Sequence, residues 1–168
     1  ISEAIDIPEH LYQIALERYQ SIGEWLERDA SSIKQFNPGI SPQGSFLLGT
    51  VNRPVGDADE YDIDLVCSLN STKAKFSMAA LKEAVGVEII DYAKAHRMKN
   101  DPEDGRRCWT LEYSDDVSFH MDILPALPDE KTYRTLLEKN GYTALAADKE
   151  IREKALAMTD KTHPKYRI

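Results

Sequence analysis

The N-terminal part of the chain carries apolar residues at helical spacing, opposite a charged face. The apolar positions are Leu11, Ile14, Ala15, Tyr19, Ile22, Trp25 and Leu26. This periodicity predicts a long amphipathic helix over about residues 8–36. The prolines and the glycine of the stretch FNPGISP, residues 36–42, are helix breakers, so the predicted helix ends there.

The middle of the chain reads as strands around one further helix. An apolar run over about residues 61–69 predicts a strand, and residues 76–98 predict a second helix despite Gly86 in its interior. Residues 107–113 and 117–127 are two apolar-rich runs separated by SDD. They predict a β-hairpin or two adjacent antiparallel strands.

The remaining segments complete the predicted order of elements. DPEDG, residues 101–105, indicates a turn, and residues 131–158 indicate mainly helix before a loop-like end. The order helix, strand, helix, two strands, helices predicts an α/β (α+β) fold with a mixed sheet flanked by helices. Because no element closes the chain and it starts at Ile1, we expect a trimmed N-terminus and a missing C-terminal portion.

Composition narrows the class of protein. A chain of 168 residues with 42% hydrophobic and 30% charged residues fits a globular protein with one core. It has no bilayer-length apolar run and no signal peptide, and Cys67 and Cys108 lack metal-type spacing, so we expect a cytoplasmic protein with reduced thiols. The net charge of −8 disfavours long nucleic acid as a partner, but it permits a nucleotide carried by a divalent cation.

Two carboxylates occupy one face of the predicted strand at 61–69. Residues i and i+2 of a strand share a face, so Asp62 and Asp64 project together while Ile63 and Leu65 face the other way. Asp is depleted in strands, and an unpaired buried carboxylate is costly. A positive partner is therefore expected at this face, although an Asp-x-Asp pair also fits a solvated sheet surface.

A third acid lies in the run 117–127. Asp122 alternates with apolar residues, so it is a lone acid in a strand that otherwise forms core. If the two strands are neighbours, three carboxylates meet, and their mutual repulsion calls for a cation such as Mg²⁺. His120 shares the face of Asp122, and a satisfied core or edge histidine is the favoured interpretation of it.

A glycine-serine turn precedes these strands. Gly44 and Ser45 follow a helix breaker, with Gln43 beside them. Glycine lets the backbone approach a ligand closely, and a serine hydroxyl can donate to a phosphate oxygen. Taken alone, the pair also fits an ordinary serine N-cap after a glycine turn.

Three segments of the sequence, in this order along the chain, resemble motifs of the nucleotidyltransferase superfamily that includes DNA polymerase beta. They are QGSFLLGTVNRP, EYDIDLVC and FHMDILPALPD. They are most similar to the bacterial cGAS/DncV-like nucleotidyltransferases, or CD-NTases, of anti-phage CBASS signalling. The resemblance implies a polymerase beta-like catalytic domain over 1–168, with its core at about 37–130 after the long N-terminal helix. It also implies that the helical region at about 131–168 is the start of a C-terminal helical lobe that is truncated here.

The resemblance also implies roles for individual residues. Asp62, Asp64 and Asp122 would be the catalytic metal ligands for two Mg²⁺ ions, for which Mn²⁺ can substitute. Gln43, Gly44 and Ser45 would bind the donor nucleotide's phosphates. The implied reaction joins nucleoside triphosphates, such as ATP, GTP or pyrimidine nucleotides, into a cyclic or linear oligonucleotide second messenger with release of pyrophosphate. Regulatory or effector proteins of the defence system would be its partners.

Three other functions stay open from the residues alone. The same site could transfer a nucleotide to a protein or RNA end, or the fold could serve as a non-catalytic nucleotide sensor. A calcium-binding loop is the weakest alternative, because DADEYDID lacks the loop glycine and the terminal glutamate spacing of an EF-hand.

Overall fold

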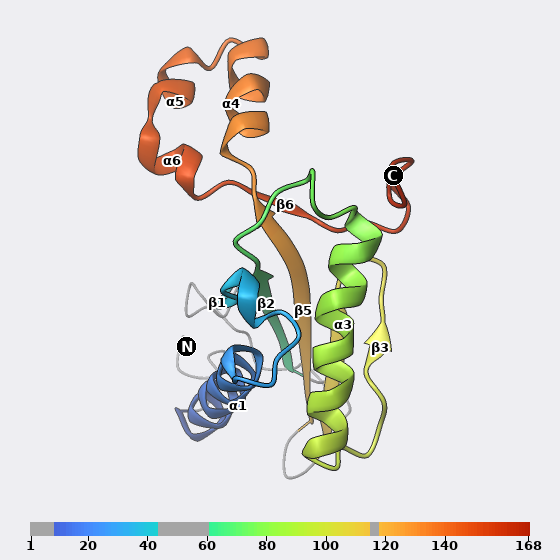
Figure 1. Cartoon of the computed structure of the whole chain (residues 1–168). Helices are drawn as coiled ribbons and strands as arrows, with labels where there is room; N and C mark the ends of the chain where they lie inside the picture. The colour runs from blue at the N-terminus through green and yellow to red at the C-terminus, as the bar shows by residue number, and fades with distance from the viewer. Residues whose placement is uncertain (1–8, 44–60, 115–117) are drawn as a thin grey trace.

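A computed structural model describes residues 9–43, 61–114 and 118–168, and its strands form one mixed sheet (Figure 1). The strands are β1 (Gly39–Pro42), β2 (Tyr61–Ser68), β3 (Glu103–Asp104), β4 (Trp109–Ser114), β5 (Ser118–Pro128) and β6 (Leu156–Met158). Their order is β1-β2-β5-β4-β3, with β6 paired to β5. β2 and β5 run parallel, whereas the other paired strands run antiparallel. The predicted mixed sheet is confirmed. The predicted antiparallel pairing of the runs 107–113 and 117–127 is also confirmed, as β4 and β5.

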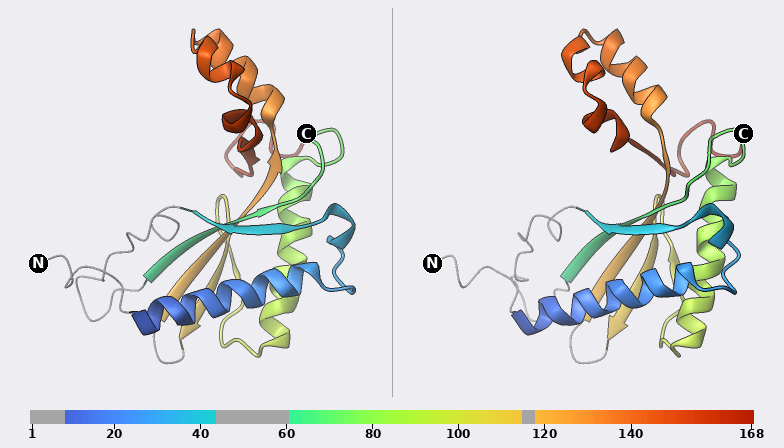
Figure 2. Two further views of the ribbon diagram at one scale, coloured as in Figure 1. Left: turned by 90° about the vertical axis from the view of Figure 1, so that its left-hand side faces the viewer. Right: turned by 60° about the vertical axis from the view of Figure 1, so that its left-hand side comes forward.

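Helices cover one face of this sheet and extend beyond one end of it. The helices are α1 (Glu9–Glu27), the short 3-10 helix η2 (Lys34–Phe36), α3 (Met78–Ala95), α4 (Glu130–Lys139), α5 (Thr143–Ala147) and α6 (Lys149–Glu153). Buried residues of α1 and α3 join those of β2, β4 and β5 in one core. Helices α4 to α6 project away from the sheet past the end of β5 (Figures 1 and 2).

The first helix is shorter than its sequence suggests. The prediction of helix to about residue 36 is wrong, because α1 ends at Glu27. Beyond it, the buried carboxylate of Glu88 accepts hydrogen bonds from the backbone N–H and hydroxyl of Ser32, at 2.6 and 2.7 Å, and from Arg28 at 2.6 Å. The serine-rich segment therefore bonds to α3 instead of continuing a helix, as short polar side chains tend to do.

Three short strands were not expected from the sequence. β1 lies where a helix-breaking loop was predicted, and its Pro42 is tolerated because β1 is an edge strand. β3 occupies part of the predicted turn at 101–105. The helical prediction is also wrong at 156–158, where β6 pairs with Ala126–Pro128 of β5. In each case pairing with a longer strand overrides weak local preference.

Gly86 is explained by a close approach inside the fold. A Cβ atom at this position of α3 would lie 2.3 Å from Cζ2 of Trp109, which is below any normal contact. The indole is held in place because its Nε1 donates to the carbonyl oxygen of Lys82 at 2.9 Å. The glycine therefore lets α3 pack directly on the first residue of β4.

Alternating burial fixes which sheet face carries the core. Ile63 and Leu65 of β2 are 1% and 0% exposed, and Met121 and Ile123 of β5 are fully buried beneath the helices. The polar residues between them emerge on the opposite face. No helix in the described part of the chain is long and apolar enough to cross a bilayer.

Candidate active site

The acidic residues of β2 lie on the sheet face that α1 and α3 leave uncovered. Asp62 and Asp64 are exposed, whereas their neighbours Tyr61 and Ile63 are buried. The face assignment made from the strand period is thus confirmed. It places both carboxylates where a ligand can reach them.

The sheet register brings the third acid to the same place. Asp64 of β2 pairs with Asp122 of β5, and Asp122 pairs on its other side with Thr110 of β4. Glu103 of β3 is the next partner of Thr110. Residues paired across neighbouring strands share a face, so these four side chains form a row across the sheet. The expected adjacency of Asp64 and Asp122 is confirmed, but within the described residues the three expected carboxylates do not converge closely enough to surround one ion.

A second row runs beside the first. Asp62 pairs with His120 of β5, and His120 pairs with Glu112 of β4. The Nδ1 atom of His120 lies 3.8 Å from Oδ1 of Asp62, and Glu112 accepts a hydrogen bond of 2.7 Å from Asn100. His120 therefore lies in the acidic site between two carboxylates and not in the core.

A hollow of about 340 Å³ opens over most of these two rows, although Asp64 does not line it. It is lined by Asp62, Asp101, Glu103, Thr110, Glu112, His120 and Asp122. Partial burial of the Asp64 carboxyl, together with the negative charges of Asp122 and Asp62, raises the pKa of Asp64 above its ordinary value. The site therefore favours a cation, because the charges of Asp122 and Asp62 raise the electrostatic cost of ionising Asp64.

One carboxylate is oriented by a neighbouring hydroxyl. Thr110 Oγ1 donates to Asp122 Oδ1 at 2.5 Å, and Cys108 Sγ lies 3.8 Å from the same threonine oxygen. Burial, followed by the negative charge of Asp122, raises the pKa of the Cys108 thiol. Cys108 is thereby kept as a neutral thiol beside the acids.

The carboxylate oxygens of Asp62, Asp64 and Asp122 are the type of ligand atom that Mg²⁺ prefers. Mg²⁺ prefers oxygen ligands, usually one or two carboxylates completed by water and substrate phosphates. Within residues 9–43, 61–114 and 118–168, no three acidic, histidine or cysteine side chains come close enough to enclose an ion by themselves. Asp62, Asp64 and Asp122 thus form an open anionic platform, which suits a cation that arrives with a nucleotide.

One known protein family matches the region of the chain that contains these acidic residues. The family described as "Cyclic GMP-AMP synthase DncV-like, nucleotidyltransferase domain" matches residues 38–125, which is more than half of the chain. The chain belongs to this family. The match includes both acidic strands and the glycine-serine segment.

Relatives of this DncV-like domain agree with the assignment. The cyclic dinucleotide synthase CdnG of Bradyrhizobium diazoefficiens is 28% identical over 130 residues, which are 76% of this chain and 29% of CdnG. A c-di-GMP synthase of Roseivirga ehrenbergii is 26% identical over 125 residues, which are 74% of this chain and 32% of that protein. The chain therefore spans about a third of the length of these curated relatives.

Solved structures show the same fold. The structure of CdnG in complex with GTP matches with a TM-score of 0.61 at 26% identity, covering 75% of this chain and 35% of CdnG. A mutant of the Vibrio cholerae di-nucleotide cyclase DncV, in complex with ATP, GTP and 5MTHFGLU2, matches with a TM-score of 0.60 at 12% identity. That match covers 98% of this chain and 56% of DncV, and it shows likeness of fold alone.

The residues that the resemblance predicts to bind phosphate lie only partly within the described part of the chain. Gln43 directly follows β1, and its backbone N–H donates to the carbonyl oxygen of Asp64 at 2.8 Å. This bond places Gln43 beside the acidic strand β2. Gly44 and Ser45 lie outside the described residues, so their role in binding phosphate stays a prediction.

Several polar residues of the site were not singled out in the sequence. Thr110 and Glu112 belong to β4, where they alternate with Trp109, Leu111 and Tyr113. The same period that placed Asp122 predicts that they share one face. Since β4 was expected beside β5, this alternation was the signal that could have found them.

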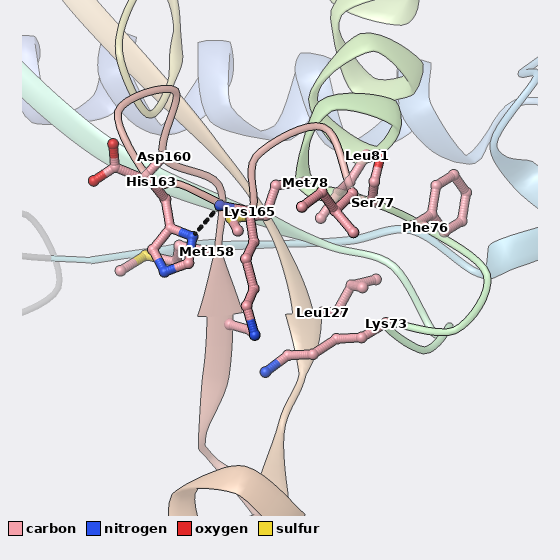
Figure 3. A pocket seen from close by; sticks show the side chains of 12 residues that line it. Lys73, Phe76, Ser77, Met78, Leu81, Leu127, Met158, Asp160, His163 and Lys165 are labelled. Atoms are coloured by element: carbon pink, nitrogen blue, oxygen red, sulfur yellow. Dashed lines mark hydrogen bonds between the residues drawn. The ribbon is translucent and has the colours of Figure 1, made fainter.

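A second cavity lies elsewhere in the chain. It has a volume of about 460 Å³ between the start of α3, the paired ends of β5 and β6, and the C-terminal segment (Figure 3). Its walls are largely apolar, with Phe76, Met78 and Leu127 among them, and Lys73 and Lys165 at its edge. None of the acidic site residues lines it.

Proposed function

We propose that this chain is part of a Mg²⁺-dependent nucleotidyltransferase that joins nucleoside triphosphates into a cyclic or linear oligonucleotide second messenger in anti-phage signalling. The observation that carries the proposal is the meeting of Asp64 and Asp122 across the parallel β2–β5 pair, with Asp62 beside them. Membership of the DncV-like family and likeness to two named cyclic dinucleotide synthases support it.

The carboxylates have separate roles in the proposed reaction. Asp62 and Asp64 would ligate the divalent cations that accompany the donor nucleotide's triphosphate, and Asp122 would ligate the catalytic cation and help to orient the acceptor hydroxyl from β5. A bound divalent cation supplies neutralisation of phosphate charge and polarisation of the reacting oxygens. The acceptor's 3′ or 2′ hydroxyl releases its proton to water, and its oxygen forms a bond to the α-phosphorus. The bond from that phosphorus to the oxygen bridging the α- and β-phosphates breaks, and pyrophosphate leaves with this oxygen.

The fold supplies positioning for this chemistry. The three aspartates lie on paired interior strands whose other faces are fully buried, so their backbones are held by sheet hydrogen bonds and core packing. Phosphoryl transfer depends mainly on alignment of reactants and on stabilisation of charge. A rigid strand pair that holds acids in register provides both.

The experiment uses the full-length natural protein with four α-phosphate-labelled nucleoside triphosphates and Mg²⁺, followed by phosphatase. The proposal predicts a phosphatase-resistant product, because a cyclic oligonucleotide has no terminal phosphate to remove. GTP is the first substrate to test, since one relative is a c-di-GMP synthase and another was solved with GTP.

Matched variants identify the source of any product. Asp64→Asn should abolish product formation, whereas Asp91→Asn, an exposed aspartate of α3, should not. Label that appears on a protein or an RNA would instead support transfer to a macromolecular end. A folded wild-type protein that binds nucleotide and forms no labelled product under any condition would contradict the enzyme assignment and favour a nucleotide sensor.

A further inference from the structure

We propose that Thr110 is a positioning residue for the reaction, whose hydroxyl fixes the direction of the Asp122 carboxylate. This inference rests on the proposed function and names a residue that acts through Asp122. It is based on the hydrogen bond that the Thr110 side chain of β4 donates to Asp122, a candidate metal ligand on the neighbouring strand β5.

The sheet places Thr110 for this contact. Thr110 and Asp122 are direct partners in the antiparallel β4–β5 ladder, so their side chains leave the same face side by side. The Thr110 hydroxyl donates to Asp122 Oδ1 at 2.5 Å. Hydrogen bonds to an ionised carboxylate are shorter and stronger than those between neutral groups.

Competition for the hydroxyl proton favours Asp122. Thr110 Oγ1 has one proton to donate and can also accept. Its second contact is Cys108 Sγ at 3.8 Å, and sulfur is a weak acceptor. The thiol is therefore the donor in that pair, and the order of donation runs from Cys108 to Thr110 to Asp122.

The threonine is also well suited to hold its bond. A β-branched side chain has restricted χ1 rotation in a strand, so the hydroxyl keeps its direction without further support. With Oδ1 bonded, rotation of the Asp122 carboxylate is limited and the direction of its second oxygen is set. Groups that orient metal ligands in this way typically change metal affinity or activity by about 10–100-fold when removed.

The test separates the hydroxyl from the shape of the side chain. Thr110→Val keeps the branched shape and removes the donor, whereas Thr110→Ser keeps the donor. Thr135→Val makes the same chemical change on α4, at a hydroxyl that bonds only within its own helix. Mn²⁺ binding, followed by water-proton relaxation, and the kinetic constants kcat and KM are measured on the full-length protein, with thermal unfolding as a check of folding.

The expected result is a loss confined to the valine variant at position 110. Thr110→Val should lower Mn²⁺ affinity or kcat by about 10–100-fold, with a smaller change in KM for the nucleotide. Thr110→Ser should restore most of this loss, and Thr135→Val should match wild type.

Two outcomes would overturn the proposal. One is a folded Thr110→Val protein with wild-type Mn²⁺ affinity and wild-type kcat. The other is a Thr110→Ser protein as impaired as Thr110→Val, because side-chain shape and not the hydroxyl would then matter. If the wild type forms no nucleotide product but the Mn²⁺ affinities follow the expected order, the proposed function fails while the positioning role stands.

Discussion

Asp64 on β2 lies directly opposite Asp122 on β5 in the parallel register of the sheet. Neither residue is near the other in sequence, and only the adjacency of these two strands joins them. The pair brings two negative charges together on the uncovered face, and Asp62 adds a third. Without a cation these charges oppose folding, and a bound cation would relieve the repulsion between them.

The first prediction concerns the stability of the metal-free protein. Asp64→Asn should raise Tm near neutral pH, because burial and two neighbouring carboxylates raise the pKa of Asp64 in the folded state. A raised carboxyl pKa means that ionising Asp64 costs more free energy in the folded state than in the unfolded state. The penalty is greatest above the folded pKa and disappears as pH falls below the ordinary value of 3.8.

Thermal unfolding of wild type and Asp64→Asn in chelator, across a pH series, checks this sign. The difference in Tm should be positive at neutral pH and shrink as pH falls. A lower Tm for the variant at neutral pH would mean that Asp64 has a stabilising partner in the folded chain, and the repulsion argument would be wrong.

The second prediction concerns metal addition. Mg²⁺ together with a nucleoside triphosphate should raise the Tm of the wild type, because a ligand that binds only the folded state stabilises it. Asp64→Asn should lose most of this rise, whereas Asp91→Asn should keep it. Equal rises in all three proteins would show that the ligand binds away from the acidic strands.

The third prediction concerns the buried anchor between α3 and the segment after α1. Burial alone would raise the pKa of Glu88, but hydrogen bonds from Ser32 and Arg28 outweigh it, so the pKa lies below the ordinary value. Glu88→Gln should lower the free energy of unfolding by about 3 kcal/mol at neutral pH, because it removes one member of a buried ionic network.

The pH dependence of that loss gives a further check by urea unfolding. A depressed carboxyl pKa contributes stability above the unfolded value, and this contribution is lost as pH falls through the folded pKa. The gap between wild type and Glu88→Gln should therefore narrow as pH falls below 4.5. Glu83→Gln, at an exposed position of the same helix, should show no such gap at any pH.

The fourth prediction concerns Gly86. Alanine normally stabilises a helix interior relative to glycine by about 1 kcal/mol. Here Gly86→Ala should be destabilising, because its methyl group would overlap the Trp109 indole at 2.3 Å and overpacking costs about 1–3 kcal/mol. Denaturant unfolding measures the change in the free energy of unfolding.

A double-mutant cycle identifies the contact responsible. The three nearest atoms to the added methyl group are Cζ2, Cε2 and Nε1 of Trp109, all in the indole. In a Trp109→Phe background the clash is reduced, so Gly86→Ala should be much less harmful there. An equal loss in both backgrounds would place the strain elsewhere.

The acidic site was readable from sequence because its signal is local. Asp62 and Asp64 share a face by the strand period, and Asp122 stands out as an acid among apolar residues. That their two strands pair with each other had to be assumed, because neither segment alone shows which distant segment it will hydrogen-bond to. The alternation of β4 could have placed Thr110 on the acidic face, but its contact with Asp122 depends on the pairing of β4 with β5 and could not be read from either segment alone.

The errors in the fold follow from tertiary contacts that local patterns do not contain. Residues 28–33 look helical by periodicity, but Glu88, far along the chain, bonds the segment and ends α1 early. Residues 156–158 favour helix in isolation, yet they pair with the end of β5. Gly86 is unfavourable for a helix by local preference alone, and its role is explained only by the close packing of Trp109 against it.

The measurement that tests the central claim most directly is pyrophosphate release by the full-length protein in the presence of Mg²⁺ and nucleoside triphosphates. The account predicts Mg²⁺-dependent release by the wild type and by Asp91→Asn, and none by folded Asp64→Asn or Asp122→Asn. Undiminished release by either of the last two variants would contradict the assignment of the paired aspartates as the catalytic centre.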